Sequence, residues 1–274
     1  MLAVRVASGL VAAAVLLVSA WWGGWWFAVF ALFVMGVCFY EFFGMFLAHD
    51  RPSRIFGLVL GLLLATWVMT GGARAEGGLA ILAGTLLLPA IWFLFRPGEL
   101  ETVASRMALT STGLLWIGGL GSVTSSLVYL ADGFFWLLLA AVLAFFSDIG
   151  AYAVGRWLGR HKLYPVISPN KTWEGAIGGV MAATGMAVAQ THFLAPQVSL
   201  AHILVLAPLA AALGQMGDLS ESMLKRSVGV KDSGQIMPGH GGLFDRIDAL
   251  LFLGPVVFLY ARVVLGVPIT WLPT

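Results

Sequence analysis

The sequence predicts an all-α membrane protein that crosses the bilayer several times. Of its 274 residues, 60% are hydrophobic and only 10% are charged, which is more apolar than a water-soluble core requires. Apolar runs recur along the whole chain, and each approaches the ~20 residues that a helix needs to cross the hydrocarbon core. The net charge of +2 gives no reason to expect a nucleic-acid partner. The single cysteine, Cys38, excludes an internal disulfide and is expected to be a small buried side chain.

Nine apolar stretches are bounded by charges, glycines or prolines, and we predict a transmembrane helix in each. Their approximate ranges are 5–22, 25–47, 54–71, 77–95, 106–130, 133–156, 173–195, 199–223 and 247–267. The first is interpreted as a helix and not as a cleaved signal, because its apolar stretch continues through a tryptophan cluster without a small-residue cleavage site. We group five spans in residues 1–130 and four in residues 131–274. Polar loops are expected at 157–172 and 224–246.

The distribution of basic residues predicts the orientation of these spans. With nine spans and a cytoplasmic N-terminus, only Arg74 and Arg262 of the 15 Lys and Arg residues lie on the side opposite the cytoplasm. Basic residues concentrate on the cytoplasmic side of membrane proteins. The C-terminus is therefore expected on the opposite side, and both long polar loops are expected to face the cytoplasm.

The sixth and eighth predicted spans carry three carboxylates between them. Asp148 lies about two turns inside the sixth span, and Asp218 and Glu221 lie at a similar depth in the eighth. Each would cost roughly 2.5–3.5 kcal/mol if it faced lipid, so these side chains should face the protein interior. Asp218 and Glu221 continue through Ser222 and Lys225 with i, i+3, i+4, i+7 spacing, which places all four on one helix face.

These acidic residues favour a metal site. Asp245 and Asp248 are spaced i, i+3 where the last helix begins, and paired carboxylates beside cations suit Mg²⁺, which prefers hard oxygen ligands. No Cys–His cluster is present, so zinc is not expected. The alternative is that the acids only pair with Lys171, Arg226 or Arg246 and fasten helices together.

The loop at 224–246 combines glycines with positive charge, a composition that suits a polyphosphate. Glycines let backbone N–H groups approach an anion closely, although a flexible turn would explain them about as well. His240 can be a phosphate donor, a general acid or a structural loop residue. The glycines are Gly239, Gly241 and Gly242, and the basic residues are Lys225, Arg226, Lys231 and Arg246.

The loop at 157–172 ends in a second arrangement that favours phosphate. Pro169 and Asn170 should turn the chain, Thr172 can cap the next helix, and Lys171 lies at the positive end of its dipole. Glu174, in the first helical turn, has an ordinary explanation in that dipole. Asp50, in an earlier loop, is interpreted as solvated.

Three segments resemble a known family. The run from Ser222 to Asp248, "SMLKRSVGVKDSGQIMPGHGGLFDRID", closely resembles the signature of the phosphatidate cytidylyltransferases, the CDP-diacylglycerol synthases. "SDIGAYAVGR" from Ser147 and "SPNKTWEG" from Ser168 look like two further blocks of that family in the right order. The first 130 residues are similar only in being apolar helices. Met237 stands where the family more often has Ile, Leu or Phe, and this change removes no chemical group that the reaction needs.

The resemblance implies a multi-pass enzyme of the cell inner membrane whose active site faces the cytoplasm. It would condense CTP with phosphatidate to give CDP-diacylglycerol and pyrophosphate, with one or more Mg²⁺ ions as cofactor, and it would act as a homodimer. The four C-terminal spans would form the catalytic region. Alternatives are a CTP-dependent enzyme acting on another lipid, such as an ether-lipid cytidylyltransferase or a polyprenol kinase, and an ion-coupled transporter.

Each candidate residue then receives a hypothesised role. Asp218 and Asp245 would hold the metal, with Asp148 and Glu221 as additional ligands. The residues assigned to catalysis are Asp218, Asp245, Lys225, Arg226, His240 and Arg246. The residues assigned to substrate binding are Ser168, Lys171, Thr172, Lys231, Gly239, Gly241 and Gly242.

Overall fold

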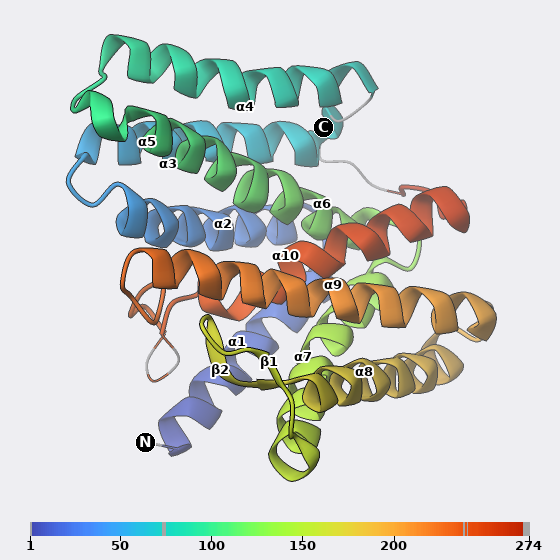
Figure 1. Cartoon of the computed structure of the whole chain (residues 1–274). Helices are drawn as coiled ribbons and strands as arrows, with labels where there is room; N and C mark the ends of the chain where they lie inside the picture. Colours follow the sequence, from blue (N-terminus) through green and yellow to red (C-terminus); the bar gives the residue numbers. More distant parts are fainter. Residues whose placement is uncertain (1, 73–74, 238, 240, 271–274) are drawn as a thin grey trace. The chain divides into compact units, whose positions relative to one another are not determined.

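The computed structural model describes residues 2–72, 75–237, 239 and 241–270, and this part of the chain is almost entirely helical (Figure 1). The all-α prediction is therefore confirmed apart from one short hairpin. The chain divides into two compact units. Unit 1 contains the residues up to Ser126 together with Asp232–Phe244, and unit 2 contains Leu127–Lys231 with Asp245–Thr270. The predicted grouping of the spans at residue 130 stays a prediction.

Unit 1 is built from six helices. These are α1 (Leu2–Trp22), α2 (Gly24–Phe46), α3 (Arg51–Trp67), α4 (Ala75–Phe95), α5 (Leu100–Gly113) and α6 (Gly121–Ser125), and the π-helical stretches η1 (Val68–Gly72) and η2 (Leu114–Leu120) continue α3 and α5.

Glycines on α3 let this helix pack tightly against aromatic residues of α2. Phe39 and Phe43 are fully buried, and a Cβ at Gly61 or Gly57 would come within 2.3 Å of Phe39 or 2.7 Å of Phe43. Cys38 is fully buried, as predicted. Small residues at such contacts are typical of helices that associate in lipid.

Asp50 begins α3 and is not the solvated residue that the sequence suggested. Its carboxylate accepts hydrogen bonds from Ser53 N at 3.2 Å and Ser53 Oγ at 2.6 Å, and it pairs with Arg106 at 3.0 Å. Ser53 Oγ accepts a hydrogen bond from Trp92 Nε1 at 2.8 Å. The network therefore ties together the start of α3, the middle of α5 and the end of α4.

Unit 2 is built around α7 (Gly133–Leu158), α8 (Trp173–Leu194), α9 (Leu200–Ser227) and α10 (Phe244–Leu259), whose first residue belongs to unit 1. The short stretches η3 (Ser126–Tyr129) and η4 (Tyr260–Val264) precede α7 and follow α10. Close packing of α7 against α8 depends on glycines, since a Cβ at Gly178 would come within 2.4 Å of Val154 and one at Gly150 within 2.8 Å of Gly178 O.

Between α7 and α8 the chain forms an antiparallel hairpin where the sequence predicted only a loop. Strands β1 (Lys162–Tyr164) and β2 (Ser168–Thr172) pair with Lys162 opposite Thr172 and Tyr164 opposite Ser168. The other predicted loop, 224–246, is shorter than expected because α9 continues to Ser227 and α10 begins at Phe244. Thr172 caps α8 as predicted, accepting a hydrogen bond from Gly175 N at 3.1 Å.

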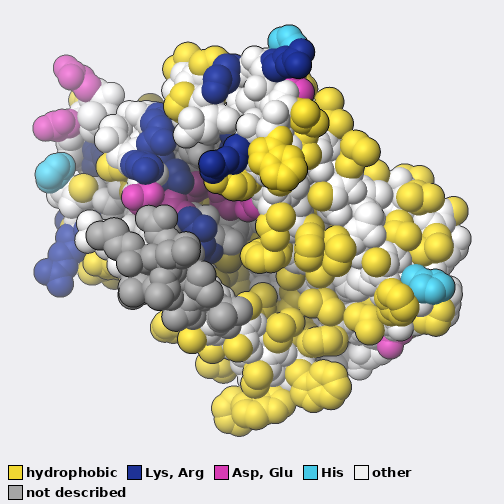
Figure 2. Space-filling model, turned by 90° about the horizontal axis from the view of Figure 1, so that it is seen from below, with side chains coloured by type: hydrophobic (Ala, Val, Ile, Leu, Met, Phe, Trp, Pro, Cys, Tyr) yellow, Lys and Arg dark blue, Asp and Glu magenta, His cyan; other side chains and the backbone are white. Residues whose placement is uncertain are grey.

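In the described residues, five helical segments are long and apolar enough to cross a membrane: Gly24–Phe46, Arg51–Thr70, Gly133–Leu158, Leu200–Ser227 and Phe244–Val264. Large hydrophobic side chains such as Phe33, Leu94 and Phe193 are more than 60% exposed. In Figure 2, hydrophobic side chains cover much of the face shown, and charged side chains gather in one region of it. These features indicate a multi-pass membrane protein.

Candidate functional site

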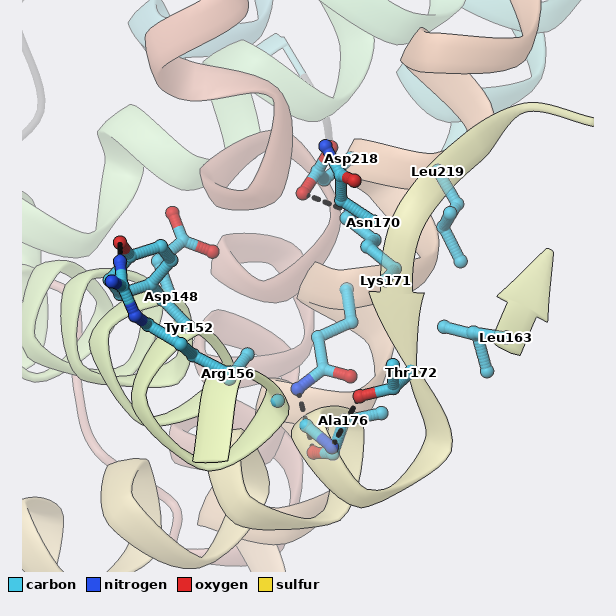
Figure 3. Close-up of a pocket in the computed structure, with 14 residues that line it drawn as sticks. Asp148, Tyr152, Arg156, Leu163, Asn170, Lys171, Thr172, Ala176, Asp218 and Leu219 are labelled. Carbon is cyan, nitrogen blue, oxygen red and sulfur yellow. Dashed lines mark hydrogen bonds and ion pairs between the residues drawn. The ribbon is translucent and has the colours of Figure 1, made fainter. Parts of the chain in front are cut away.

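Lys171 and Asp218 form the first ion pair of the candidate site. Lys171 follows the turn of the hairpin on β2, and its ammonium group donates a short hydrogen bond to Asp218 Oδ2 on α9 (Figure 3). Both side chains are about one-quarter to one-third exposed, at 30% and 26%. The pair therefore places opposite charges on a surface that a small polar molecule can reach.

Lys225 forms a second, deeper cluster with two carboxylates. Its Nζ lies 2.5 Å from Glu221 Oε2, one turn earlier on α9, and 2.5 Å from Asp245 Oδ1 in the first turn of α10. The exposed fractions of Lys225, Glu221 and Asp245 are 9%, 1% and 5%. The Lys225 ammonium compensates the charge of Glu221 through Oε2, whereas the other oxygen, Oε1, is buried without a hydrogen-bond partner in the described part of the chain.

Asp148 and Asp248 extend this acidic region. Asp148, on α7, is repelled by the charge of Asp218 and attracted by Lys171 and Arg246. Asp248, one turn after Asp245, is buried and accepts a hydrogen bond from Ala249 N at 2.7 Å. The sequence analysis noted the spacing of Asp248 but gave it no role. Burial and the repulsion from Asp148, Asp218 and Glu221 are the features that make it a candidate, and neither is visible in the sequence.

A cavity of about 520 Å³ lies beside the Lys171–Asp218 pair, entirely within unit 2. This volume is within the range of small-molecule sites. Figure 3 shows its wall: Asp148, Tyr152 and Arg156 come from α7, and Asn170, Lys171 and Thr172 come from β2. Gln215, on α9, also lines the cavity and donates hydrogen bonds to Ser147 Oγ and Ala176 O, both at 3.0 Å. Tyr152 and Arg156 stand in the family-like block that begins at Ser147 but were given no role there, and Gln215 was missed because nothing local marks it.

Glycines allow the backbone to close around Thr172 beside this cavity. A Cβ at Gly159 or Gly175 would lie 2.8 or 2.9 Å from Thr172 Oγ1. Glu174, in the first turn of α8, accepts hydrogen bonds from Arg160 N at 3.1 Å and His161 N at 3.2 Å and contacts His161 Nδ1 at 2.6 Å. Glu174 therefore fixes the chain that enters the hairpin, which is a structural contact.

The remaining predicted basic residues of unit 2 lie on its surface. Arg226 is exposed and donates a hydrogen bond to Val230 O at 2.8 Å, and Lys231 and Arg246 are exposed. Ser168 pairs with Tyr164 in the hairpin and does not line the cavity. The alternative interpretation of the acidic residues was that they pair with Lys171, Arg226 or Arg246. Lys171 does form such an ion pair, with Asp218.

The predicted phosphate-binding glycines belong to unit 1. Gly239 and Gly241 have φ angles of 77° and 82°, a left-handed backbone that favours glycine. Met237 N donates to Gly241 O at 3.0 Å and closes this turn. Gly242 lies against Ser233 and Glu41. His240 lies outside the described residues, so its predicted role stays a prediction.

The donor chemistry of unit 2 fits Mg²⁺, although the described residues contain no group of three Asp, Glu, His or Cys side chains close enough to hold a metal by themselves. Glu221 offers one buried carboxylate oxygen, Oε1, that accepts no hydrogen bond, and the neighbouring groups that could ligate a metal are all carboxylates. Mg²⁺ usually takes one or two carboxylates and completes its shell with water and substrate phosphates. The carboxylate pairs of this unit therefore match what Mg²⁺ requires when a phosphate is also bound.

Comparisons with known proteins agree with this chemistry. The model of the cytidylyltransferase family matches residues 3–264. The chain is 43% identical over 127 residues to a phosphatidate cytidylyltransferase of Staphylococcus haemolyticus, and 42% identical over the same length to those of Staphylococcus saprophyticus and Staphylococcus aureus. The matched segment covers 46% of this chain and 49% of each relative, so the chain spans about half the length of these relatives. Because the family model covers nearly the whole sequence, the chain belongs to the cytidylyltransferase family.

Proposed function

We propose that this protein transfers CMP from CTP to phosphatidate and so produces CDP-diacylglycerol and pyrophosphate. The observation that carries the proposal is the concentration of charge in unit 2 of an apolar helical protein. Asp148, Lys171 and Asp218 line a cavity, and a second cluster on α9 and α10 pairs Lys225 with Glu221 and Asp245. Family membership and the printed activity of the relatives support CTP and phosphatidate as the substrates.

In this reaction a phosphate oxygen of phosphatidate attacks the α-phosphorus of CTP. A new P–O bond forms, the bond from the α-phosphorus to the β-bridging oxygen breaks, and pyrophosphate leaves with the electron pair. The attacking phosphate is already an anion at neutral pH, so no strong general base is required. What the protein must supply is in-line positioning and neutralisation of negative charge.

The charged residues divide between these two tasks. Asp218 and Asp245 would hold Mg²⁺ together with water and substrate phosphates, and Asp148 and Glu221 would become additional ligands only if the bound ion drew these side chains closer together. When bound, Mg²⁺ neutralises phosphate charge and orients the polyphosphate. Lys171 is paired with Asp218, and Lys225 lies between Glu221 and Asp245, so both ammonium groups are oriented before a phosphate arrives. The exposed cations assigned to phosphate are Arg226, Lys231 and Arg246, and His240 is assigned with them.

We also propose the membrane arrangement that this chemistry requires. Nine spans with a cytoplasmic N-terminus would put both polar connections on the cytoplasmic side of the inner membrane, where CTP is found. A homodimer is the proposed assembly. A cavity at the membrane boundary would let a lipid headgroup reach CTP while its acyl chains stay in lipid.

Pyrophosphate release from CTP and phosphatidate by the purified protein tests the proposal. We expect release that requires both substrates and stops when Mg²⁺ is chelated, together with a product of the mass of CDP-diacylglycerol. Product only from an ether-linked lipid or a polyprenol would identify the related CTP-dependent enzymes. Ion-driven uptake in liposomes without pyrophosphate release would identify a transporter.

A substitution of Asp218 tests whether this residue is a metal ligand. We expect Asp218→Asn to lower kcat by a factor of about 100 or more at limiting Mg²⁺, because loss of a ligand removes charge stabilisation from the transition state. Asp132→Asn is the matched control, since Asp132 is exposed, contacts Gln197 only weakly at 3.3 Å and has a φ of 56° that Asn also tolerates. Near-normal activity of Asp218→Asn would show that the metal assignment is wrong.

A further inference from the structure

Glu41 is a buried acidic residue in the C-terminal half of an apolar helix. It lies on α2, inside the candidate span Gly24–Phe46, and is 3% exposed. None of the ion pairs among the described residues includes it. Ionisable residues within membrane-spanning helices are costly and usually have a function. The mechanism above does not use this residue, so its environment needs an explanation.

The Glu41 carboxylate is satisfied by the segment Asp232–Phe244. Oε1 accepts a hydrogen bond from Leu243 N at 3.0 Å, and Oε2 accepts one from Phe244 N at 2.9 Å and one from Ser233 Oγ at 3.1 Å. Leu243 and Phe244 are at the start of α10, where backbone N–H groups have no partner within the helix. Glu41 therefore caps α10 from another helix and holds both ends of the segment.

Two glycines of the segment have the shape that this contact demands. A Cβ at Gly234 would lie 2.5 Å from Glu41 Oε1, and one at Gly242 would lie 2.6 Å from Oε2 and 2.0 Å from Ser233 Oγ. Neither glycine has the left-handed backbone seen at Gly239 and Gly241. Close approach to a carboxylate, and not the turn, explains why both positions lack a side chain.

We propose that Glu41 is a positioning residue for the transfer reaction: it fixes the glycine-rich segment and the first turn of α10. Asp245, a proposed metal ligand, directly follows Phe244 in the chain, so the backbone that Glu41 holds is the backbone from which Asp245 projects. This inference rests on the proposed function for its catalytic part. Its structural part, the anchoring of residues 232–244, stands on unit 1 alone.

The test compares variants of the full-length protein in detergent or lipid. Glu41→Gln keeps the shape but replaces one acceptor oxygen by a donor that faces backbone N–H groups. We expect kcat to fall by about 10–100-fold, as for other residues that orient a ligand. We also expect faster amide hydrogen exchange at residues 241–246. Gly234→Ala, which pushes the segment away while leaving Glu41 intact, should have the same two effects.

Asp50→Asn is the matched control. Asp50 is also a carboxylate of unit 1 that accepts three hydrogen bonds, but it does not contact the segment. We expect this variant to lower the melting temperature without changing exchange at 241–246, and to keep kcat within about twofold of the wild type. An activity loss in Glu41→Gln that only follows the fraction of unfolded protein, as in the control, would overturn the proposal.

Failure of the inference can be distinguished from failure of the proposed function. Wild-type protein that releases no pyrophosphate contradicts the function, yet exchange at 241–246 still decides whether Glu41 anchors the segment. Unchanged exchange in Glu41→Gln and Gly234→Ala would overturn the anchoring in either case. If Glu41→Gln does not fold, the milder Gly234→Ala decides alone: normal kcat and normal exchange in that variant would overturn the proposal.

Discussion

Lys225 balances the charge of the deepest part of the candidate site. Its ammonium group lies 2.5 Å from one oxygen each of Glu221 and Asp245, and all three side chains are less than one-tenth exposed. Removing one member of a buried ion pair leaves an uncompensated charge, which costs more than replacing the whole pair by apolar groups. The stability of unit 2 and its proposed chemistry therefore depend on the same residue.

Replacing this lysine should reveal both contributions. We expect Lys225→Met to lower the free energy of unfolding by about 3–5 kcal/mol and to abolish pyrophosphate release. Adding Glu221→Gln should restore part of the stability, because one buried charge is removed, but no activity. Denaturant unfolding of the two variants and the wild type measures the difference. Equal stability of Lys225→Met and the wild type would contradict the charge-balance argument.

Asp50 provides a pH-dependent contribution outside the predicted spans. Partial burial by itself would raise the pKa of Asp50, but hydrogen bonds from Ser53 and the Arg106 guanidinium outweigh it and hold the pKa below its usual value of 3.8. The folded protein therefore binds this proton less tightly than the unfolded chain. Ionised Asp50 stabilises the fold above the unfolded pKa, and this contribution is lost as the pH falls through the lower folded pKa.

The helix-capping role of Asp50 gives a second prediction. At neutral pH, Asp50→Asn should lower the free energy of unfolding by about 0.5–2 kcal/mol, the range for loss of a helix cap. Below pH 4 the difference from the wild type should shrink, because protonated Asp50 loses the same interactions. Melting curves from pH 3 to pH 7 measure this, with the exposed residue Glu99 changed to Gln as the control. A difference independent of pH would show that the charge of Asp50 contributes nothing.

At the scale of the elements, helix packing depends on where glycines meet branched side chains. Gly178 and Gly185 lie on the same helix, α8, and differ only in their surroundings. A Cβ at Gly178 would come within 2.4 Å of Val154 on α7, whereas one at Gly185 would meet nothing within 4 Å. The first glycine is required by a helix contact, and the second is not.

The pair gives a matched test. We expect Gly178→Ala to destabilise the protein by about 1–3 kcal/mol through overpacking. Adding Val154→Ala to this variant should restore part of the lost stability, because it removes the side chain that the new methyl group would meet. Gly185→Ala should be neutral or stabilising by up to about 1 kcal/mol, because alanine favours the helix. Thermal unfolding of the three variants decides. Equal effects at both glycines would mean that α7 and α8 do not pack as closely as the structure shows.

Features that repeat along the chain could be predicted from the sequence, whereas features that depend on distant contacts could not. Apolar runs of the right length predicted helices, and i, i+3, i+4 spacing correctly placed Asp218, Glu221 and Lys225 on one helix, α9. The hairpin at 162–172 was missed because its strands, of three and five residues, are too short for a periodic pattern. Glu41 carried a signal, a charge inside the predicted span 25–47, but its role could not be predicted because its partners lie about 200 positions later in the chain.

For the whole molecule, the orientation of the catalytic residues depends on whether α8 crosses the membrane. This helix has 22 residues, about 33 Å at 1.5 Å per residue, which is enough for a hydrocarbon core of about 30 Å. It is not among the five segments of the described chain that are both long and apolar enough to cross a membrane by composition, and glycines and polar residues such as Gln190 interrupt it. The proposed nine-span topology requires that α8 crosses.

Accessibility of single cysteines to a membrane-impermeant reagent tests this topology. Cys38 is the single native cysteine and is fully buried, so Cys38→Ala provides a background without reactive thiols. Val166, 84% exposed in the hairpin turn, should react as Val166→Cys only from the cytoplasmic side. Gln197, exposed in the connection between α8 and α9, should react as Gln197→Cys only from the opposite side. Labelling of both cysteines from one side would show that α8 does not span the membrane. With one crossing fewer, every segment after α8 would lie on the opposite side, so residues 224–246 could no longer be assigned to the cytoplasm.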